Sequence, residues 1–163
     1  MEASRLLLLA LVPMFAFGGR AQVILAQISD ALADKDQKRR PIPLLAAGLV
    51  CGALSASTMA YAGFLAVATL PDAAHRALIA GALGLATFEL AWPVRVAPTR
   101  EPTRALGAIG AVLLVRLLGD AARLTVFAVA VLTRDPIGAA LAGGIGGAIA
   151  VALGWSLGAE SLS

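Results

Sequence analysis

The chain is divided into apolar blocks of roughly 20 residues, each long enough to cross the ~30 Å hydrocarbon core of a membrane as a helix. Only 14% of its 163 residues are charged, against about a quarter in soluble domains, and its mean hydropathy is +0.87. This pattern predicts an all-α, polytopic membrane bundle of five spans without a soluble domain. The predicted spans are Leu6 to Ile28, Ile42 to Leu70, Ala73 to Trp92, Ala105 to Leu132 and Pro136 to Leu157.

Polar breaks between the blocks indicate the orientation. The segments 29–40 and 93–104 are too charged to enter lipid, and together they carry seven Lys and Arg residues. The opposite side carries three, which are Arg5, Arg76 and Arg134. Because basic residues are retained on the cytoplasmic side, we expect a multi-pass protein of a bacterial inner membrane with its N-terminus outside.

A repeat of about 95 residues relates the two halves, as in transporters built from inverted repeats. Pro-Ile starts a span at positions 41 and 136, and each start precedes a glycine pair, Gly48 and Gly52 in one copy and Gly143 and Gly147 in the other. Glycines four residues apart let another helix approach closely. The predicted organisation is a first repeat of three spans (1–92), a basic cytoplasmic loop (93–104), and a second repeat of two spans with a short C-terminal stub (105–163).

Two features of this organisation stay open at the sequence level. The first span resembles a cleaved signal peptide in its leucine run and small residues, although cleavage would remove the repeat partner of the fourth span. The stub from Gly154 to Ser163 either ends a five-span protein or begins a sixth helix that a second subunit completes.

Charge inside an apolar span is costly and marks a candidate functional site. Arg116, Asp120 and Arg123 have helical spacing, which predicts that they share one face of the fourth span. Arg20 lacks a carboxylate in its own span, so Asp120 is its predicted partner, either as a structural ion pair or as part of a transport site. His75, beside a predicted turn, is expected to be a solvated loop residue.

The charged segments resemble the motif of the GDT-one family, also called the transmembrane-protein-165 family. Its members carry two copies of Glu-x-Gly-Asp-(Lys or Arg)-(Thr or Ser), on the first and fourth of six helices. Here the segment 16–21, followed by Gln22, and the segment 117–122 occupy the motif places. The resemblance implies a transporter of Mn²⁺ or Ca²⁺ that exchanges the cation for protons and binds it through the motif carboxylates.

Only Asp120 is acidic among the four acidic motif positions, although hard divalent cations usually need several oxygen ligands. Three roles therefore remain: a divergent cation transporter, a non-transporting partner subunit that keeps the fold, and an anion or small-solute carrier that uses the intramembrane arginines. The candidate site residues are Gly18, Gly19, Arg20, Gln22, Arg116, Gly119, Asp120 and Arg123, with Asp120 as the metal ligand.

Other classes of function have little support in the residues. The spans contain no His-carboxylate cluster or paired acids, so we expect no enzyme and no cofactor. A net charge of +3 without a basic face interleaved with aromatic residues gives no support to nucleic-acid binding. Cys51 is the single cysteine and is interpreted as a packing residue. The expected partners are the lipid bilayer, transported Mn²⁺, Ca²⁺ or protons, and a second subunit in a homo- or hetero-oligomer.

Overall fold

The computed structural model describes residues 42–91 and 106–157, and this part of the chain is all-helical. The helices are α3 (Ile42–Thr69), α4 (Asp72–Ala91), α5 (Leu106–Leu118), α6 (Ala121–Thr133) and α7 (Pro136–Leu157). The predicted second, third and fifth spans are thus confirmed as helices to within two residues at each end. The first predicted span and the stub after Leu157 lie outside the described residues.

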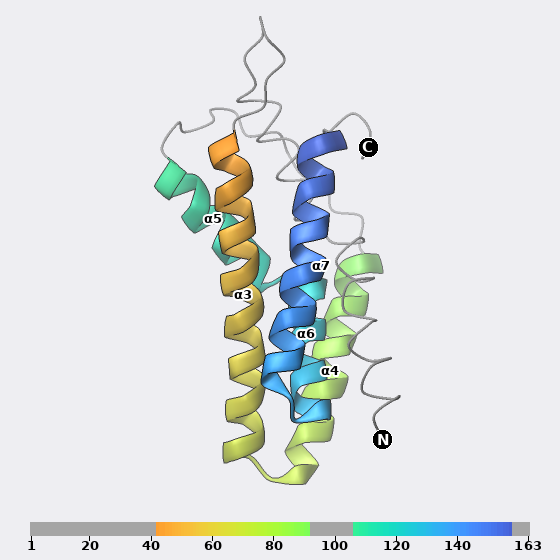
Figure 1. The fold of residues 1–163 in the computed structure, drawn as a ribbon. Helices are drawn as coiled ribbons and strands as arrows, with labels where there is room; N and C mark the ends of the chain where they lie inside the picture. Colours follow the sequence, from red (N-terminus) through yellow and green to blue (C-terminus); the bar gives the residue numbers. More distant parts are fainter. Residues whose placement is uncertain (1–41, 92–105, 158–163) are drawn as a thin grey trace, which may run out of the picture.

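The two long helices α3 and α7 lie side by side and run in opposite directions (Figure 1). Each follows a Pro-Ile start in the sequence, and Pro136 occupies the first turn of α7, where a missing N–H costs no helical hydrogen bond. The buried residues of α3, such as Gly48, Gly52 and Ala56, recur every three or four residues and form one face. This face is the side of α3 that meets the rest of the bundle.

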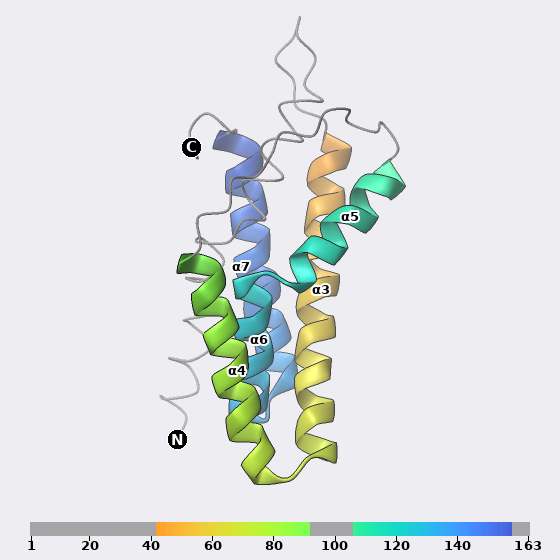
Figure 2. The same ribbon diagram turned by 180° about the vertical axis from the view of Figure 1, so that it is seen from behind.

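Helix α6 is the centre of the bundle, and it contacts α3, α4 and α7 (Figure 2). Ten of its 13 residues are buried, including Val126 and Ala130. Thr125 and Thr133 donate their hydroxyl protons to backbone carbonyls one turn earlier in the same helix, at 2.8 Å each, so α6 needs no solvent to satisfy these groups. Helix α5 lies obliquely against α3, away from α6.

The predicted fourth span is broken, and this corrects the expectation of one continuous helix. Helix α5 ends at Leu118, Gly119 forms a turn, and Asp120 is extended, with φ −73° and ψ 144°, before α6 starts. Extended geometry at Asp120 is typical of a residue at a helix N-terminus. Chain direction therefore changes inside an apolar block that contains no proline.

Two tight corners close one end of the bundle, at the predicted breaks 70–72 and 133–136. Arg134 ends α6 in the left-handed region, with φ 56°, and donates its backbone N–H to the Ala130 carbonyl at 3.0 Å. Asp135 then caps α7 by accepting the Gly138 N–H at 2.9 Å. These caps let α7 turn back immediately beside α6.

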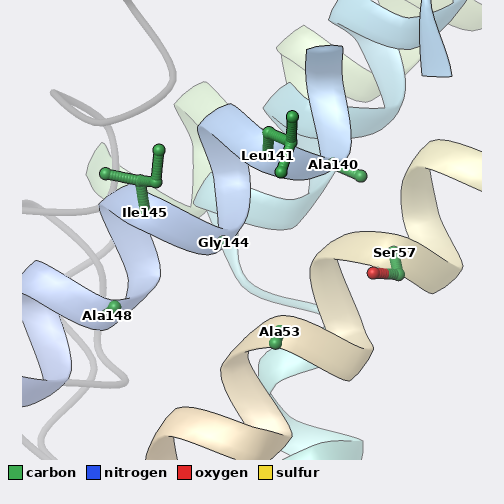
Figure 3. Close-up of a pocket in the computed structure, with 7 residues that line it drawn as sticks. All are labelled: Ala53, Ser57, Ala140, Leu141, Gly144, Ile145 and Ala148. Atoms are coloured by element: carbon green, nitrogen blue, oxygen red, sulfur yellow. The ribbon is translucent and has the colours of Figure 1, made fainter. Parts of the chain in front are cut away.

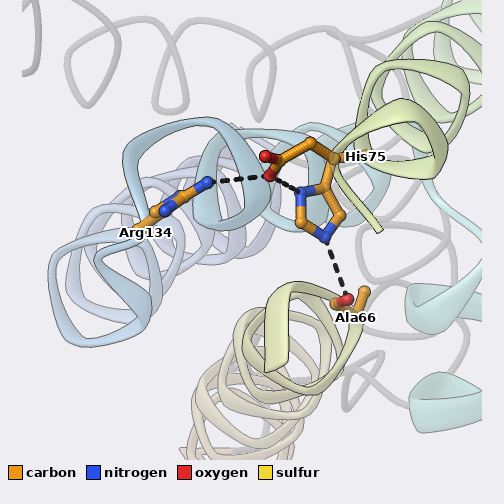
Figure 4. A network of polar contacts seen from close by, with 4 residues as sticks. Ala66, His75 and Arg134 are labelled. Atoms are coloured by element: carbon orange, nitrogen blue, oxygen red, sulfur yellow. Dashed lines mark hydrogen bonds and ion pairs between the residues drawn. The ribbon is translucent and has the colours of Figure 1, made fainter. Parts of the chain in front are cut away.

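His75 is buried rather than solvated, so the sequence-based expectation for it was wrong. Because α4 begins at Asp72, His75 lies one turn into that helix, with Nε2 3.2 Å from the Ala66 carbonyl of α3 (Figure 4). Its Nδ1 is 3.3 Å from Asp72 Oδ1, which also accepts a hydrogen bond from Arg134 Nη2 at 3.1 Å. The network joins the ends of α3, α4 and α6.

Two described helices are long and apolar enough to cross a membrane: α3, and α7 over Pro136–Leu153. Both leave large apolar side chains exposed, including Leu54, Leu141 and Ile145. This is weak evidence for a membrane location, and the five-span arrangement stays a prediction.

Candidate functional site

The break between α5 and α6 brings two charged groups into the interior of the bundle. Asp120 immediately precedes α6 and is only 4% exposed, and Arg123, in the first turn of α6, is 2% exposed. Asp120 interacts electrostatically with Arg123. The Asp120 carboxylate accepts no capping hydrogen bond from the backbone amides in the first turn of α6.

The Arg123 guanidinium is held by helix α3. Its Nε donates to Ser55 Oγ at 2.9 Å, and its Nη2 donates to the Gly52 carbonyl at 3.1 Å. The Ser55 hydroxyl donates in turn to the same Gly52 carbonyl at 3.0 Å. Nε and Nη2 of Arg123 are therefore held by neutral acceptors, and these hydrogen bonds do not neutralise its charge.

Two glycines leave the space that the guanidinium fills. A Cβ atom added at Gly147 of α7 would lie 2.7 Å from Arg123 Nη2, and one added at Gly52 would lie 3.4 Å from the same atom. The first distance is too short for a real contact, whereas the second is tight but tolerable. The glycine pairs were interpreted as helix-packing positions, and at these two positions the packed group is a charged side chain.

The guanidinium lies near the middle of both long helices. Ser55 is at the midpoint of α3 and Gly147 is at the midpoint of α7. With a rise of 1.5 Å per residue, Ser55 is about 20 Å from either end of α3. Apolar clusters lie on both sides of this level, one with Leu44 and Val151 and the other with Ala60 and Ala139.

The structure separates Arg116 from the other two predicted charges. Arg116 is exposed in the last turn of α5, where its charge is favourable at the helix C-terminus. The expected shared face of Arg116, Asp120 and Arg123 is wrong, because the turn at Gly119 interrupts the helical register between them. Gly119 itself has open space at its Cβ position, so steric crowding does not require a glycine there.

Four predicted site residues cannot be placed: Gly18, Gly19, Arg20 and Gln22 lie outside the described residues. The predicted Arg20 to Asp120 pair therefore stays a prediction. The structure adds Ser55 and Gly147, which sequence reasoning did not assign to the site. Ser55 is three residues after Gly52, so a search for polar side chains on the glycine face of α3 would have found it.

The described residues contain no group of three or more His, Cys, Asp or Glu side chains arranged to hold a metal ion. A divalent cation at Asp120 would thus depend on backbone carbonyls or on residues outside 42–91 and 106–157 for its remaining ligands. Divalent cations prefer several oxygen ligands, and the described residues do not group carboxylates in this way around Asp120.

A hollow with a volume of about 310 Å³ lies between α3 and α7 on the outside of the bundle. Figure 3 shows the residues that line it. The hydroxyl of Ser57 is the single polar side-chain group in its lining, so it offers nothing to recognise a charged solute. It is lined by Ala53, Ser57, Ala140, Leu141, Gly144, Ile145 and Ala148.

Comparison with known protein families, curated proteins and solved structures gave no significant match for this chain.

Proposed function

We propose that the chain is an integral membrane transporter that exchanges a cation for protons, with Asp120 as the exchanging carboxylate. The observation that carries the proposal is the broken helix, which places Asp120 beside Arg123 in the centre of an apolar bundle. Transporters use discontinuous helices in this way, because the free helix ends and nearby charges bind a solute near the bilayer midplane.

The arrangement of the long helices supports the same proposal. Helices α3 and α7 follow equivalent Pro-Ile starts and pack in opposite directions, as the matching spans of an inverted repeat must. The charged site lies at the middle of both helices, as the midplane position of a cargo site requires. The cargo suggested by the resemblance to the GDT-one family is Mn²⁺ or Ca²⁺.

A single buried carboxylate couples a cation to protons for a simple electrostatic reason. A proton and a cation bind a buried carboxylate in competition, because each neutralises the same negative charge. Release of one favours binding of the other.

Transport by the purified full-length chain in proteoliposomes tests the proposal. We expect a pH gradient to drive Mn²⁺ uptake, measured by quenching of an enclosed dye, and we expect Asp120→Asn to abolish it. Asp72→Asn is the matched control, because Asp72 is an exposed carboxylate at the end of the bundle. Equal uptake by the wild type and Asp120→Asn contradicts the assignment of Asp120.

An anion or small-solute carrier is the second candidate, and the geometry of Arg123 favours it. The hydrogen bonds of Arg123 use Nε and Nη2 and leave Nη1 without an acceptor among the described residues. A solute carboxylate or phosphate could accept from Nη1. In this case flux of the anion in the same proteoliposomes falls on Arg123→Gln, while Mn²⁺ flux is absent. Absence of both fluxes in a correctly assembled protein favours the non-transporting partner subunit.

A further inference from the structure

The Arg123 guanidinium occupies the place where the two repeat copies meet. Gly52 and Gly147 are the second glycines of the two equivalent pairs, and the guanidinium lies against both of them. A group between equivalent positions of two repeats is close to the axis that relates them. In transporters of this design, the cargo binds near that axis.

The guanidinium is also the wrong group for a purely apolar packing role. It is fully charged, 2% exposed, and hydrogen-bonded to a hydroxyl and a carbonyl that carry no net charge. Removal of a guanidinium from water costs free energy that an apolar side chain of similar volume would avoid, and the nearby charge of Asp120 offsets part of this cost. The position thus combines a costly charge with a space that two glycines keep open.

We propose that Arg123 is a built-in cation that occupies the cargo position and competes electrostatically with a cation at Asp120. This inference rests on the proposed function for the identity of the cargo, and it assigns Arg123 the role of setting cation affinity. The positive charge near Asp120 stabilises the charged carboxylate and weakens binding of an external cation. The site then binds its cargo loosely enough to release it.

Binding of Mn²⁺ to the full-length chain in lipid nanodiscs, measured by titration calorimetry, tests this role. We expect Arg123→Gln to bind Mn²⁺ at least tenfold more tightly than the wild type, since a buried unit charge close to a divalent cation changes its binding by at least that factor. Arg123→Met is a second neutral variant, and loss of a buried charge to an apolar residue is often tolerated or stabilising.

Two control variants separate charge from packing. Arg116→Gln removes an exposed positive charge from the neighbouring helix α5, and Gly144→Ala adds a methyl group to α7 where no atom lies within 4 Å. Both should bind Mn²⁺ within about twofold of the wild type. A gain in affinity in Arg116→Gln equal to that in Arg123→Gln contradicts the inference, because the effect would then come from the net charge of the protein and not from the buried guanidinium.

The outcomes for the inference and for the proposed function are distinct. If both neutral variants bind Mn²⁺ no more tightly than the wild type, the inference is overturned, even where Asp120-dependent transport shows that the proposed function is correct. If the wild type transports no cation but the neutral variants bind Mn²⁺ in a manner abolished by Asp120→Asn, the proposed function fails and the inference stands.

Discussion

Replacement of Gly147 by alanine is the most direct perturbation of the buried guanidinium. The new methyl group would lie 2.7 Å from Arg123 Nη2, so the side chain must move. Movement puts at risk its hydrogen bonds to Ser55 Oγ and the Gly52 carbonyl. Each hydrogen bond from a charged group contributes about 1.5–3 kcal/mol, so loss of both costs about 3–6 kcal/mol.

Part of this cost is offset by the helix. Alanine is favoured over glycine in a helix interior by about 1 kcal/mol. The net expectation for Gly147→Ala is a loss of about 2–5 kcal/mol in the free energy of unfolding. Titration with SDS in mixed micelles, followed by tryptophan fluorescence, measures this quantity for helical membrane proteins.

Gly144→Ala is the matched control in the same helix. An added Cβ atom at Gly144 meets no atom within 4 Å, so this variant should be as stable as the wild type or up to about 1 kcal/mol more stable. If Gly147→Ala is as stable as Gly144→Ala, the guanidinium does not occupy the space beside α7, and the contact described between them is wrong.

A double-mutant cycle identifies the source of the effect. In the Arg123→Met background the guanidinium is absent, so Gly147→Ala should cost less than about 1 kcal/mol there. Non-additivity of this kind is the expected mark of two groups in contact. An equal cost in both backgrounds would show that another neighbour of Gly147 is responsible.

Two further predictions concern helix packing and the closed end of the bundle. Gly63→Ala should lower the free energy of unfolding by about 1–3 kcal/mol, because the added Cβ would lie 2.8 Å from the Ala130 Cβ. Gly84→Ala is the control, because an added Cβ there meets open space and should not be destabilising. Equal stability of the two variants in the SDS titration would contradict the prediction. Asp72→Asn should lower the free energy of unfolding by less than about 1 kcal/mol, because the Asp72 and Arg134 side chains are 83% and 64% exposed and solvent screens their ion pair. A larger loss in the SDS titration would contradict this prediction.

The sequence was sufficient to predict the long helices but not the break between α5 and α6. Apolar block length and Pro-Ile starts predicted α3 and α7, because these signals determine helix position directly. Gly119 and Asp120 lie inside a continuous apolar block, and each is tolerated in a helix at a cost of about 1 kcal/mol or less. The preference of Asp for helix N-termini could have indicated a helix start at Asp120. The helical spacing of Arg116, Asp120 and Arg123 favoured a continuous helix instead.

The buried site was predictable in its charges but not in its contacts. Asp120 and Arg123 lie within an apolar block of the sequence, and the structure buries both of them. Periodicity could not show that Arg123 points toward α3, because this depends on how α6 packs after the break. For the same reason, the contact of Gly147 with a guanidinium could not be distinguished from ordinary helix packing.

A buried ion pair that only fixes helix register is the simplest alternative to a transport role for these charges. Such a pair is most stable when the guanidinium donates directly to the carboxylate. Arg123 instead donates to Ser55 and Gly52 on α3, and no direct hydrogen bond to Asp120 occurs among its contacts with described residues. The two charges therefore influence each other without a direct hydrogen bond between them. What fixes α6 against α3 at this level is the hydrogen bonding of Arg123 to Ser55 and Gly52, so an ion pair of Arg123 with Asp120 is not needed to set the register of these two helices.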